Sequence, residues 1–327
     1  MSRRVLVTGG AGFIGSHVAA AYVAAGDDVT ILDDLSTGRL ENVPAGARLV
    51  RADIRSPEAR ACLATGGFAL LNHHAAQMDI RRSVGDPVFD ADVNVLGLLN
   101  LLEGARDGGV RRVIVASSGG AVYAESNTLP VAEEAAKLPI SPYGSAKLAT
   151  EYYLATFARL YGLESVVLRY SNVYGPRQNP DGEAGVVAIF ARRILRREPI
   201  TIFGDGLQTR DLVYVSDVAE ANLRASDYTP GPLRDLDSRA FNIATGIETA
   251  VRAVAERLAR RVGRPVEMCG KPARAGEVRR SALAIDKAVR ELRWQPRTAL
   301  QDGLASTLEA IDRRVSRTRG LARSWAV

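Results

Sequence analysis

Short apolar runs alternate with helical patterns through the first half of the chain. The apolar runs, each followed by small or polar residues, are residues 4–8, 29–32, 49–50, 68–72, 113–116 and 165–169. Helical periodicity marks Ser16 to Ala25 and Val93 to Arg106. Buried strands that alternate with helices are typical of a parallel sheet covered by helices on both faces. The pattern therefore predicts an α/β fold with a doubly wound parallel sheet for residues 1–170.

Beyond Tyr170 the pattern changes to loops and short elements. Gly-Pro, Pro-Asp-Gly and Gly-Asp-Gly sequences interrupt residues 175–206. We expect helices over 185–197, 217–225 and 249–261, and a strand over 241–243. The expected organisation is a sheet domain over 1–170 to which 212–245 return, a smaller C-terminal substrate-binding lid domain from 171–211 and 246–312, and a basic, frayed tail over 313–327. Such a lid would cover the carboxyl ends of the strands, where open α/β sheets bind ligands.

The first strand leads directly into a glycine-rich turn. Gly9, Gly12 and Gly15 follow the first apolar run and precede the first helical pattern. Glycines in such a turn let the backbone bend tightly and let a pyrophosphate approach the helix N-terminus. The turn therefore predicts a Rossmann-like dinucleotide-binding domain.

Asp33 and Asp34 end the second apolar run, about 20 residues after this turn. A carboxylate at this place accepts hydrogen bonds from the ribose diol of a dinucleotide. No arginine directly follows the run to receive a 2′-phosphate. We therefore expect NAD rather than NADP as the cofactor.

Composition argues against several other functions. The 327 residues are 46% hydrophobic and contain no apolar run near the ~20 residues of a membrane span. The net charge of +6 comes from four lysines and 39 arginines that are spread along most of the chain, so we expect neither nucleic acid nor a membrane as partner. Cys62 and Cys269 match no metal spacing, and His73 and His74 have no third ligand in view, so we expect no metal. Because the first strand has begun by Val5, we do not expect a signal peptide. We expect the cysteines to be reduced and the protein to be cytoplasmic.

Tyr143 and Lys147 give the most informative sign of catalysis. They lie four residues apart, behind a serine suited to cap a helix and a proline suited to its first turn, so they share one helix face. A free tyrosine has a pKa of about 10. A neighbouring ammonium and a cationic nicotinamide would lower this pKa toward working pH. The pair therefore predicts a tyrosine base, whereas an exposed pair on a surface helix is disfavoured by the dinucleotide-binding turn.

The chain resembles the extended short-chain dehydrogenases/reductases, and among them the NAD-dependent UDP-glucose (UDP-galactose) 4-epimerases. The resemblance runs from about Arg4 to Leu308 and rests on residues 8–17, 33–38, 168–175 and 203–206, on Arg210-Asp211 and on the pair Tyr143 and Lys147. It implies C4 epimerisation of a UDP-hexose through a transient 4-keto sugar, with NAD held throughout. It also implies a homodimer formed through helices near 93–106 and 142–161.

The resemblance also implies roles for individual residues. Those implied to bind NAD are Gly9, Gly12, Phe13, Ile14, Gly15, Asp33, Asp34, Leu35, Ser36, Thr37, Gly38, Asp53, Ile54, Ala75, Ala76, Gln77, Asn94, Ser117, Tyr143, Lys147, Tyr170 and Val173. Those implied to bind the UDP-sugar are Asn172, Val186, Thr201, Phe203, Arg210, Arg274 and Ser281. The guanidinium groups of Arg210 and Arg274 suit a diphosphate.

One position departs from the family pattern. The family usually has Ser or Thr three residues before the Val of its Val-Tyr-Gly motif, and counting back from Val122 gives Gly119. The hydroxyl that normally shares a hydrogen bond with the substrate is therefore absent there. Ser118, Ser117 or a water molecule are the alternatives, and we select Ser118 as the catalytic candidate beside Tyr143 and Lys147.

Other positions argue against related reactions. Nucleotide-sugar 4,6-dehydratases have Asp-Glu where this chain has Gly120 and Ala121, and UDP-glucuronate decarboxylases have Glu at the latter. UDP-glucuronate 4-epimerases have Arg where this chain has Asn179, so we expect a neutral hexose. The open alternatives are another NAD-dependent nucleotide-sugar epimerase or ketoreductase of secondary metabolism, and a dinucleotide-binding regulator without turnover.

The size of the accepted sugar is a further expectation. In the family, a bulky Tyr seven residues after the diphosphate-binding Arg excludes N-acetylated sugars. Counting from Arg274 gives Ser281. We therefore expect tolerance of UDP-GlcNAc and UDP-GalNAc besides UDP-Glc and UDP-Gal.

Overall fold

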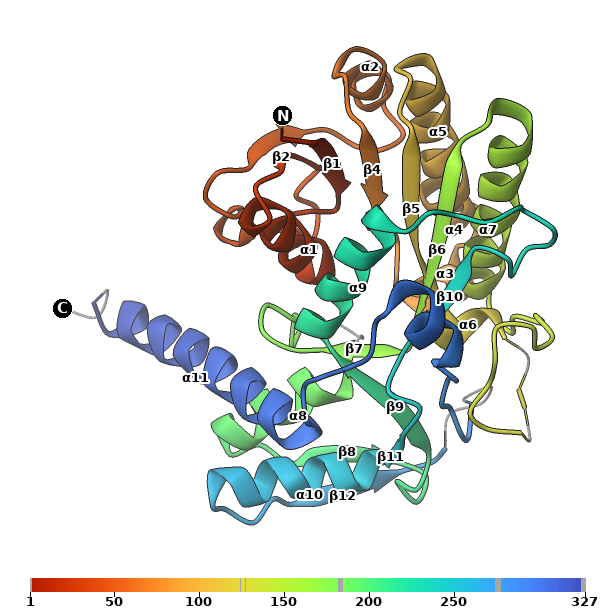
Figure 1. Ribbon diagram of the computed structural model, residues 1–327. Coiled ribbons are helices and arrows are strands. Elements are labelled where there is room, and N and C mark those ends of the chain that lie inside the picture. The colour runs from red at the N-terminus through yellow and green to blue at the C-terminus, as the bar shows by residue number, and fades with distance from the viewer. Residues whose placement is uncertain (1, 124, 127, 182–184, 274–277, 325–327) are drawn as a thin grey trace.

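A seven-stranded parallel sheet forms the larger part of the molecule (Figure 1). The computed structural model describes residues 2–123, 125–126, 128–181, 185–273 and 278–324. Neighbouring strands are all parallel, in the order β10 (Ala240–Ile243), β6 (Glu164–Tyr170), β5 (Arg112–Ser118), β4 (Leu70–His73), β1 (Arg4–Thr8), β2 (Asp28–Asp33) and β3 (Arg48–Arg51). The predicted Rossmann-like, doubly wound α/β sheet is thus confirmed.

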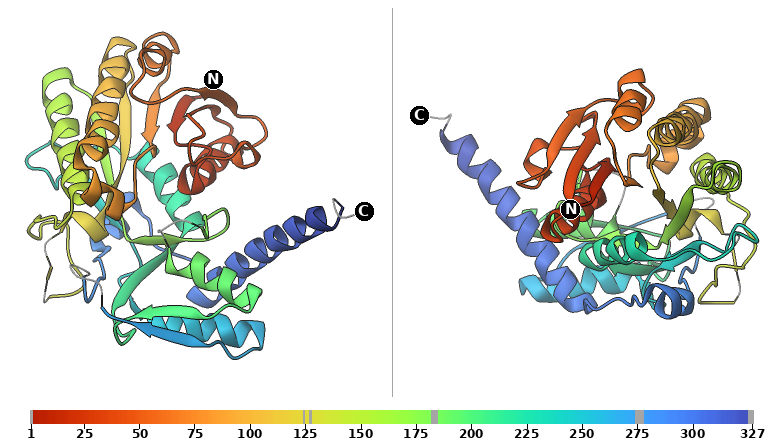
Figure 2. Two further views of the ribbon diagram at one scale, coloured as in Figure 1. Left: turned by 180° about the vertical axis from the view of Figure 1, so that it is seen from behind. Right: turned by 45° about the horizontal axis from the view of Figure 1, so that its top comes forward.

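Helices cover both faces of this sheet (Figure 2). On one face, α1 (Phe13–Ala24) and α9 (Val215–Asp227) bury Val18, Tyr22 and Val218 against the strands. On the other, α2 (Pro57–Thr65), α5 (Gly97–Asp107) and α7 (Pro142–Tyr161) bury Leu63 and Leu101. The six strands other than the edge strand β3 are therefore buried on both sides, as parallel strands in a three-layer fold are. From β1 the chain adds β2 and β3 on one side of the sheet and then crosses back to place β4 on the other side of β1. Such a reversal of strand order opens a ligand crevice at the carboxyl ends of the strands.

A smaller unit lies below the carboxyl ends of the strands in the view of Figure 1. It contains a three-stranded sheet of β7 (Asn172–Tyr174), β9 (Thr209–Tyr214) and β11 (Glu248–Ala250), and a pair formed by β8 (Ile200–Phe203) and β12 (Met268–Lys271). Three helices, α8 (Val186–Arg196), α10 (Val251–Val262) and the first half of α11 (Leu300–Ser324), share an apolar core with these strands. We refer to this unit as the lid.

Several element boundaries differ from the sequence-based expectation. α1 begins at Phe13 rather than Ser16, because the glycine turn passes directly into the first helical turn. The helix expected from Val93 begins as a π-helical turn, η2 (Asp92–Leu96), and continues as α5. Residues 248–250 form a strand before α10. The frayed tail expected over 313–327 is wrong for residues 313–324, through which α11 continues.

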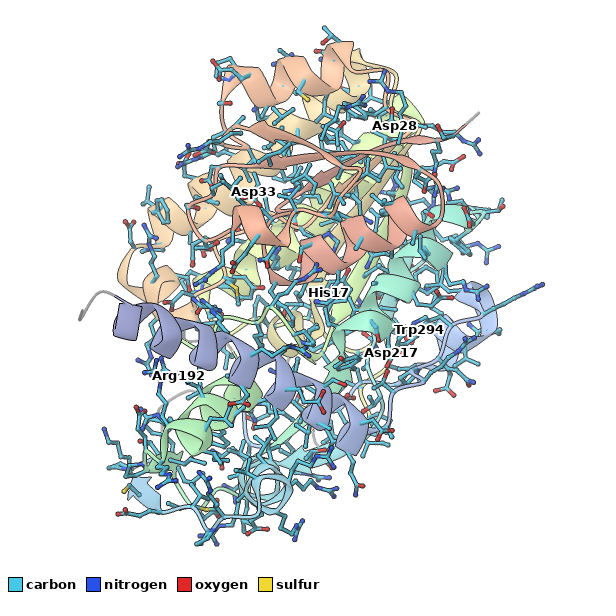
Figure 3. All side chains as sticks on the ribbon, turned by 90° about the vertical axis from the view of Figure 1, so that its left-hand side faces the viewer. His17, Asp28, Asp33, Arg192, Asp217 and Trp294 are labelled. Atoms are coloured by element: carbon cyan, nitrogen blue, oxygen red, sulfur yellow. The ribbon has the colours of Figure 1, made fainter. Side chains whose placement is uncertain are left out.

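The remaining elements are short. They are the 3-10 turn η1 (Leu40–Asn42), α3 (Ile80–Gly85), α4 (Pro87–Ala91), α6 (Gly119–Val122) and the π turn η3 (Ala288–Leu292). Trp294, just after η3, is buried and donates its indole N–H to the carbonyl of Asp217 at 2.8 Å, which joins this segment to α9 (Figure 3). Across the described residues, none of the helices is long and apolar enough to span a membrane.

Candidate active site

The glycine turn at the end of β1 is built for a close approach of backbone to a ligand. Gly9 has φ +64°, and a Cβ there would lie 2.7 Å from the backbone nitrogen of Ala75, so no other residue fits. A Cβ at Gly15 would lie 2.2 Å from the Gly9 carbonyl oxygen, whereas one at Gly12 would meet only that oxygen, at 3.1 Å. Gly15 therefore packs against the turn itself, and Gly12 leaves the outer side of the turn open.

The first helical turn offers unpaired donors beside this opening. α1 begins after Gly12 without a side-chain cap and with no acidic residue in its first turn. Its first N–H groups and the positive end of its dipole remain available for an anion. This arrangement fits the pyrophosphate of a dinucleotide, as the sequence predicts.

Asp33, at the end of β2, stabilises the glycine turn through hydrogen bonds (Figure 3). One carboxylate oxygen accepts from the Ala11 N–H at 3.0 Å and the other from the Leu35 N–H at 2.9 Å. Burial raises the pKa of Asp33, and these two N–H groups oppose that rise. A Cβ at Gly38 would lie 2.6 Å from the same carboxylate, so residues 33–38 pack closely on the turn. The predicted ribose-binding carboxylate and its flanking residues are therefore brought to the glycine turn.

Residues predicted to line the rest of the cofactor cleft follow β3 and β4. Ile54 is buried, and Asp53 is paired with Arg55, whose side chain lowers the Asp53 pKa. The Gln77 N–H donates to Asn94 Oδ1 at 3.0 Å, and Asn94 Nδ2 donates to the Gln77 carbonyl at 2.9 Å. The Asn94 side chain is thus committed to shaping the loop after β4.

Two residues of the loop after β7 were not singled out from the sequence. Pro176 and Arg177 reach back to α1, where the Pro176 carbonyl lies 3.0 Å from His17 Nε2 and Arg177 Nη1 lies 3.1 Å from Ser16 Oγ. Arg177 has φ +68° and has no acidic partner in the described part of the chain. Burial accordingly lowers its pKa. A partly desolvated guanidinium thus lies beside the start of α1.

The first turns of α7 carry Tyr143 and Lys147. Ser141 caps the helix by accepting from the Gly144 N–H at 3.2 Å, and Pro142 occupies the first turn, as predicted. The Lys147 ammonium is buried and donates to the Ala116 carbonyl of β5 at 3.0 Å. It lies 5.9 Å from the centre of the Tyr143 ring. The helix can approach the strand end closely because residue 144 is a glycine, whose Cβ would lie 2.4 Å from the Ala121 carbonyl oxygen.

Burial shifts the pKa of both groups away from their usual values. Burial, with a smaller contribution from the charge of Asp90, raises the pKa of Tyr143 to about 12. The Ser118 side chain opposes this rise. Burial lowers the pKa of Lys147 to about 8, although the charges of Asp90 and Glu151 raise it. The sequence-based expectation combined the ammonium with a cationic nicotinamide, and it stays a prediction: without that second charge, burial holds the phenol pKa above its usual value.

The two serines at the end of β5 point in different directions. Ser117 Oγ donates to Glu151 Oε1 at 2.5 Å, whereas the Ser118 side chain faces the Tyr143 phenol and lowers its pKa. Successive side chains on a strand face opposite sides, so only one of two neighbours can reach the phenol. The geometry therefore favours Ser118, and not Ser117, as the replacement for the hydroxyl missing at Gly119.

The predicted substrate residues lie in the lid, with one exception that falls outside the described residues. Asn172 is in β7, Val186 in α8, Thr201 and Phe203 in β8, Arg210 in β9, and Ser281 follows β12. Arg274 is the residue outside the described ranges. The Arg210 guanidinium donates to the carbonyls of Thr209 and Val278 at 2.7 and 2.9 Å. It is therefore held in place by backbone acceptors.

The loop that carries Ser281 is anchored by the buried Asp211. Its carboxylate accepts from the Leu283 N–H at 3.2 Å and from the Thr245 and Gly246 N–H groups at 2.8 and 2.9 Å. This fixes the chain two residues after Ser281 against the end of β10.

Two further cofactor candidates, Tyr170 and Val173, belong to the core beneath the site. Tyr170 is buried, and its hydroxyl bonds His74 Nε2 at 3.0 Å and the Asn222 side chain at 2.8 Å. Val173 packs against the same core. His73 Nδ1 lies 2.8 Å from Thr8 Oγ1. Among the described residues, no cluster of three or more His, Cys, Asp or Glu side chains is arranged to hold a metal ion.

Comparisons with known proteins agree with this geometry. A model of the NAD dependent epimerase/dehydratase family matches residues 5–244. The UDP-glucose 4-epimerase of Mycolicibacterium smegmatis is 44% identical over 311 residues, 94% of this chain and 97% of the relative. The crystal structure of UDP-glucose 4-epimerase with UDP-glucose from Thermotoga maritima matches with a TM-score of 0.91 and 44% identity over 95% of this chain and 99% of the other. The crystal structure of the Thermus thermophilus UDP-glucose 4-epimerase complex with NAD matches with a TM-score of 0.87 and 43% identity, over 94% and 98%.

Proposed function

The chain belongs to the NAD dependent epimerase/dehydratase family, and we propose that it inverts C4 of a UDP-hexose, interconverting UDP-glucose and UDP-galactose with NAD as its cofactor. The observation that carries this function is the placement of Tyr143, which lies beside Ser118, with its ring centre 5.9 Å from the buried ammonium of Lys147, at the carboxyl end of β5. A phenol held in this way suits proton exchange with a sugar hydroxyl.

The described residues fit the cofactor. Gly9, Gly12 and the start of α1 would hold the pyrophosphate, Asp33 with residues 34–38 the adenosine ribose, and Ala75 the nearby cleft wall. Bound NAD supplies a hydride acceptor and donor for sugar C4 and adds positive charge near Tyr143. That charge is of the sign needed to lower the raised pKa of the phenol.

Three side chains then handle the sugar proton. Tyr143 takes the proton of the 4-hydroxyl and returns it after the 4-keto sugar has presented its other face. Ser118 holds the phenol in position and shares its hydrogen bond with the reacting oxygen. Lys147 stabilises the phenolate, because an ammonium in a water-poor site interacts strongly with a nearby anion.

The lid would bind the nucleotide and orient the sugar. By family resemblance, we assign Arg210 and Arg274 to the diphosphate and Asn172, Val186, Thr201 and Phe203 to the rest of the UDP-sugar. Ala121 and Asn179 offer neither an acid for elimination nor a cation for a sugar carboxylate. These features support a neutral hexose.

We also propose that UDP-GlcNAc and UDP-GalNAc are accepted. By family resemblance, Ser281 takes the position at which a bulky tyrosine would restrict the space around the sugar 2-substituent. A serine side chain is smaller than a tyrosine by a whole phenol ring and leaves that space free. The anchoring of the following residues on Asp211 keeps Ser281 in one place.

We further propose a cytoplasmic homodimer. Exposed apolar side chains gather on α3, α4, η2 and α7, namely Ile80, Val84, Val88, Leu96, Tyr152, Tyr153 and Leu160. Pairing of these helices between two copies would bury side chains that water otherwise surrounds. Cys62 and Cys269 are both free thiols, which suits a reducing compartment.

The test of the proposed function is a direct product assay. Purified protein is incubated with UDP-galactose, and the nucleotide sugars are separated and identified. We expect UDP-glucose to form without net oxidation of the sugar. A protein that retains NAD but converts neither UDP-hexose would contradict the proposal.

A further inference from the structure

A buried carboxylate lies on α7, two turns beyond Tyr143. Glu151 follows Lys147 by four residues, so the two share one face of α7. Only 1% of Glu151 is exposed, and neither the proton exchange nor the cofactor uses its carboxylate. A fully buried carboxylate is costly unless it is paired and hydrogen-bonded.

The Glu151 carboxylate joins α7 to two strands of the sheet. It accepts from Ser117 Oγ of β5 at 2.5 Å. It also receives Arg169 of β6, with Nη2 to Oε2 at 2.7 Å and Nε to Oε1 at 3.1 Å. Arg169 is fully buried and extends the network to Asp237 at 2.8 Å and to the Tyr123 hydroxyl at 3.0 Å.

As a result, three successive residues of β5 are held by three residues of α7. The Ala116 carbonyl accepts from Lys147, Ser117 donates to Glu151, and the Ser118 side chain faces the phenol of Tyr143 and lowers its pKa. The Glu151 contact lies in the middle of this set along the strand. It therefore anchors the strand one residue before Ser118.

We propose that Glu151 is a positioning residue for the reaction: it fixes the end of β5 so that Ser118 meets Tyr143, and its charge supports the ammonium of Lys147. Because this inference rests on the proposed roles of Tyr143 and Lys147, its test includes a measurement that does not require turnover.

The charges around Lys147 come from several elements. Asp90 of α4 and Glu151 of α7 favour its protonated form, burial disfavours it, and His73 and His74 at the end of β4 lie near enough to sense its charge. Around Glu151 itself lie Lys147, Ser117 and Arg169. Removing the Glu151 charge should therefore lower the pKa of Lys147 further, so that the ammonium is lost at a lower pH.

The test compares Glu151→Gln with Asp237→Asn. Glu151→Gln keeps the shape and an acceptor for Ser117 but removes the charge. Asp237→Asn removes an equivalent charge from the far side of Arg169, so it reports the purely structural effect of weakening the network. We expect Glu151→Gln to lower kcat at least tenfold with little change in KM, and to move the alkaline limb of the kcat–pH profile to lower pH. Asp237→Asn should lower the melting temperature without moving that limb.

Ser117→Ala covers the case in which Glu151→Gln does not fold. It removes the contact between β5 and Glu151 and leaves the ion pair with Arg169 intact. We expect a kcat at least tenfold lower, with the alkaline limb unchanged. Wild-type kcat in Ser117→Ala, or wild-type kcat and pH profile in a folded Glu151→Gln, would overturn the proposal.

The ionisation of Tyr143 separates this inference from the proposed function. The phenolate absorbance of Tyr143 is obtained as the difference between a protein with Tyr143 and the same protein with Tyr143→Phe, followed against pH. We expect the midpoint to rise in Glu151→Gln, because the phenolate loses support from Lys147. If the wild type turns over no UDP-hexose but this midpoint rises, the function fails and the role of Glu151 stands. An unchanged midpoint overturns that role.

Discussion

A Cβ atom at Gly119 would lie 2.4 Å from Cδ1 of Leu283, whose side chain is only 2% exposed. Leu283 thus fills the space into which the hydroxyl-bearing side chain of other family members would extend. Glycine at position 119 and the buried Leu283 therefore belong to one packing arrangement, and Ser118 is the neighbouring serine whose side chain lowers the pKa of Tyr143.

This relationship predicts that the usual serine cannot simply be restored. Gly119→Ser should overlap with Leu283 and destabilise the protein by ~1–3 kcal/mol, as overpacking in a core does. The free energy of unfolding in urea measures this. Leu283→Ala should relieve the overlap, so the double variant should be less destabilised than the sum of the two single changes. Additive single and double effects would contradict the proposed packing.

Ser118 should be the hydroxyl that matters for catalysis. Ser118→Ala removes the hydrogen bond that lowers the pKa of Tyr143, so kcat should fall by about 10²-fold while NAD content stays unchanged. Steady-state kinetics with UDP-galactose provide the measurement. A kcat equal to the wild type would show that water, or another group, holds the phenol.

Lys147 is expected to cost stability at neutral pH. Burial lowers its pKa from 10.5 to about 8, so the folded state binds this proton less tightly than the unfolded state. Lys147→Met should therefore raise the free energy of unfolding at pH 7 by up to ~3 kcal/mol while abolishing activity. The sign follows from linkage: the penalty that buried Lys147 imposes on wild-type stability falls between about pH 8 and 10.5, so the advantage of the variant should shrink over that window.

Chemical denaturation of the wild type and Lys147→Met at about pH 7 and about pH 10 tests whether the advantage of the variant shrinks, since most of the window lies between these two values. Lys271→Met, at an exposed end of β12, is the matched control and should change stability little at either pH. An equal gain for Lys147→Met at both values would show that burial of the ammonium is not its cause.

Arg177 should contribute to cofactor binding although it lies in the loop after β7. Its guanidinium lies 3.1 Å from Ser16 beside the start of α1, where the positive end of the helix would repel it unless an anion is bound. Arg177→Gln should weaken NAD binding about tenfold, a loss of ~1.4 kcal/mol, in calorimetric titrations of NAD-free protein. Arg197 has a similar left-handed φ of +60° but lies at the end of α8, so Arg197→Gln controls for backbone effects. Equal NAD affinity of both variants and the wild type would exclude the role.

Ser281 should determine the size of the accepted sugar. Ser281→Tyr is expected to abolish turnover of UDP-GlcNAc and UDP-GalNAc while UDP-Glc and UDP-Gal remain substrates. Ser281→Ala, which keeps the space open, should behave like the wild type with all four sugars. Parallel loss of both sugar pairs in Ser281→Tyr would mean that this position does not gate the 2-substituent.

The fold could be predicted because strand and helix periods are local properties of the chain. The strand, glycine turn and helix of residues 4–24 follow from apolar runs and from glycines that no other residue can replace. The π-helical turn at Asp92–Leu96 could not be predicted from local periodicity, and its Asn94 side chain accepts from the backbone of Gln77 in the loop after β4, a contact that local patterns do not reveal.

The catalytic pair was visible in the sequence, but its supporting residues were not. Ser117 and Ser118 are chemically identical, and only the direction of each side chain on β5 distinguishes them. Glu151 continues the four-residue spacing of Tyr143 and Lys147, so that spacing carried a signal for it. Its partner Arg169 comes from another strand, which local patterns cannot reveal.

The most direct test of the central claim is the conversion of UDP-galactose in D2O, followed by NMR. Because the hydrogen at C4 is removed and returned within the site, the wild type should produce UDP-glucose with protium at C4. Tyr143→Phe, purified with its NAD, should form UDP-glucose far more slowly than the wild type. Deuterium at C4 of the product, or an undiminished rate in Tyr143→Phe, would contradict an epimerisation that depends on Tyr143.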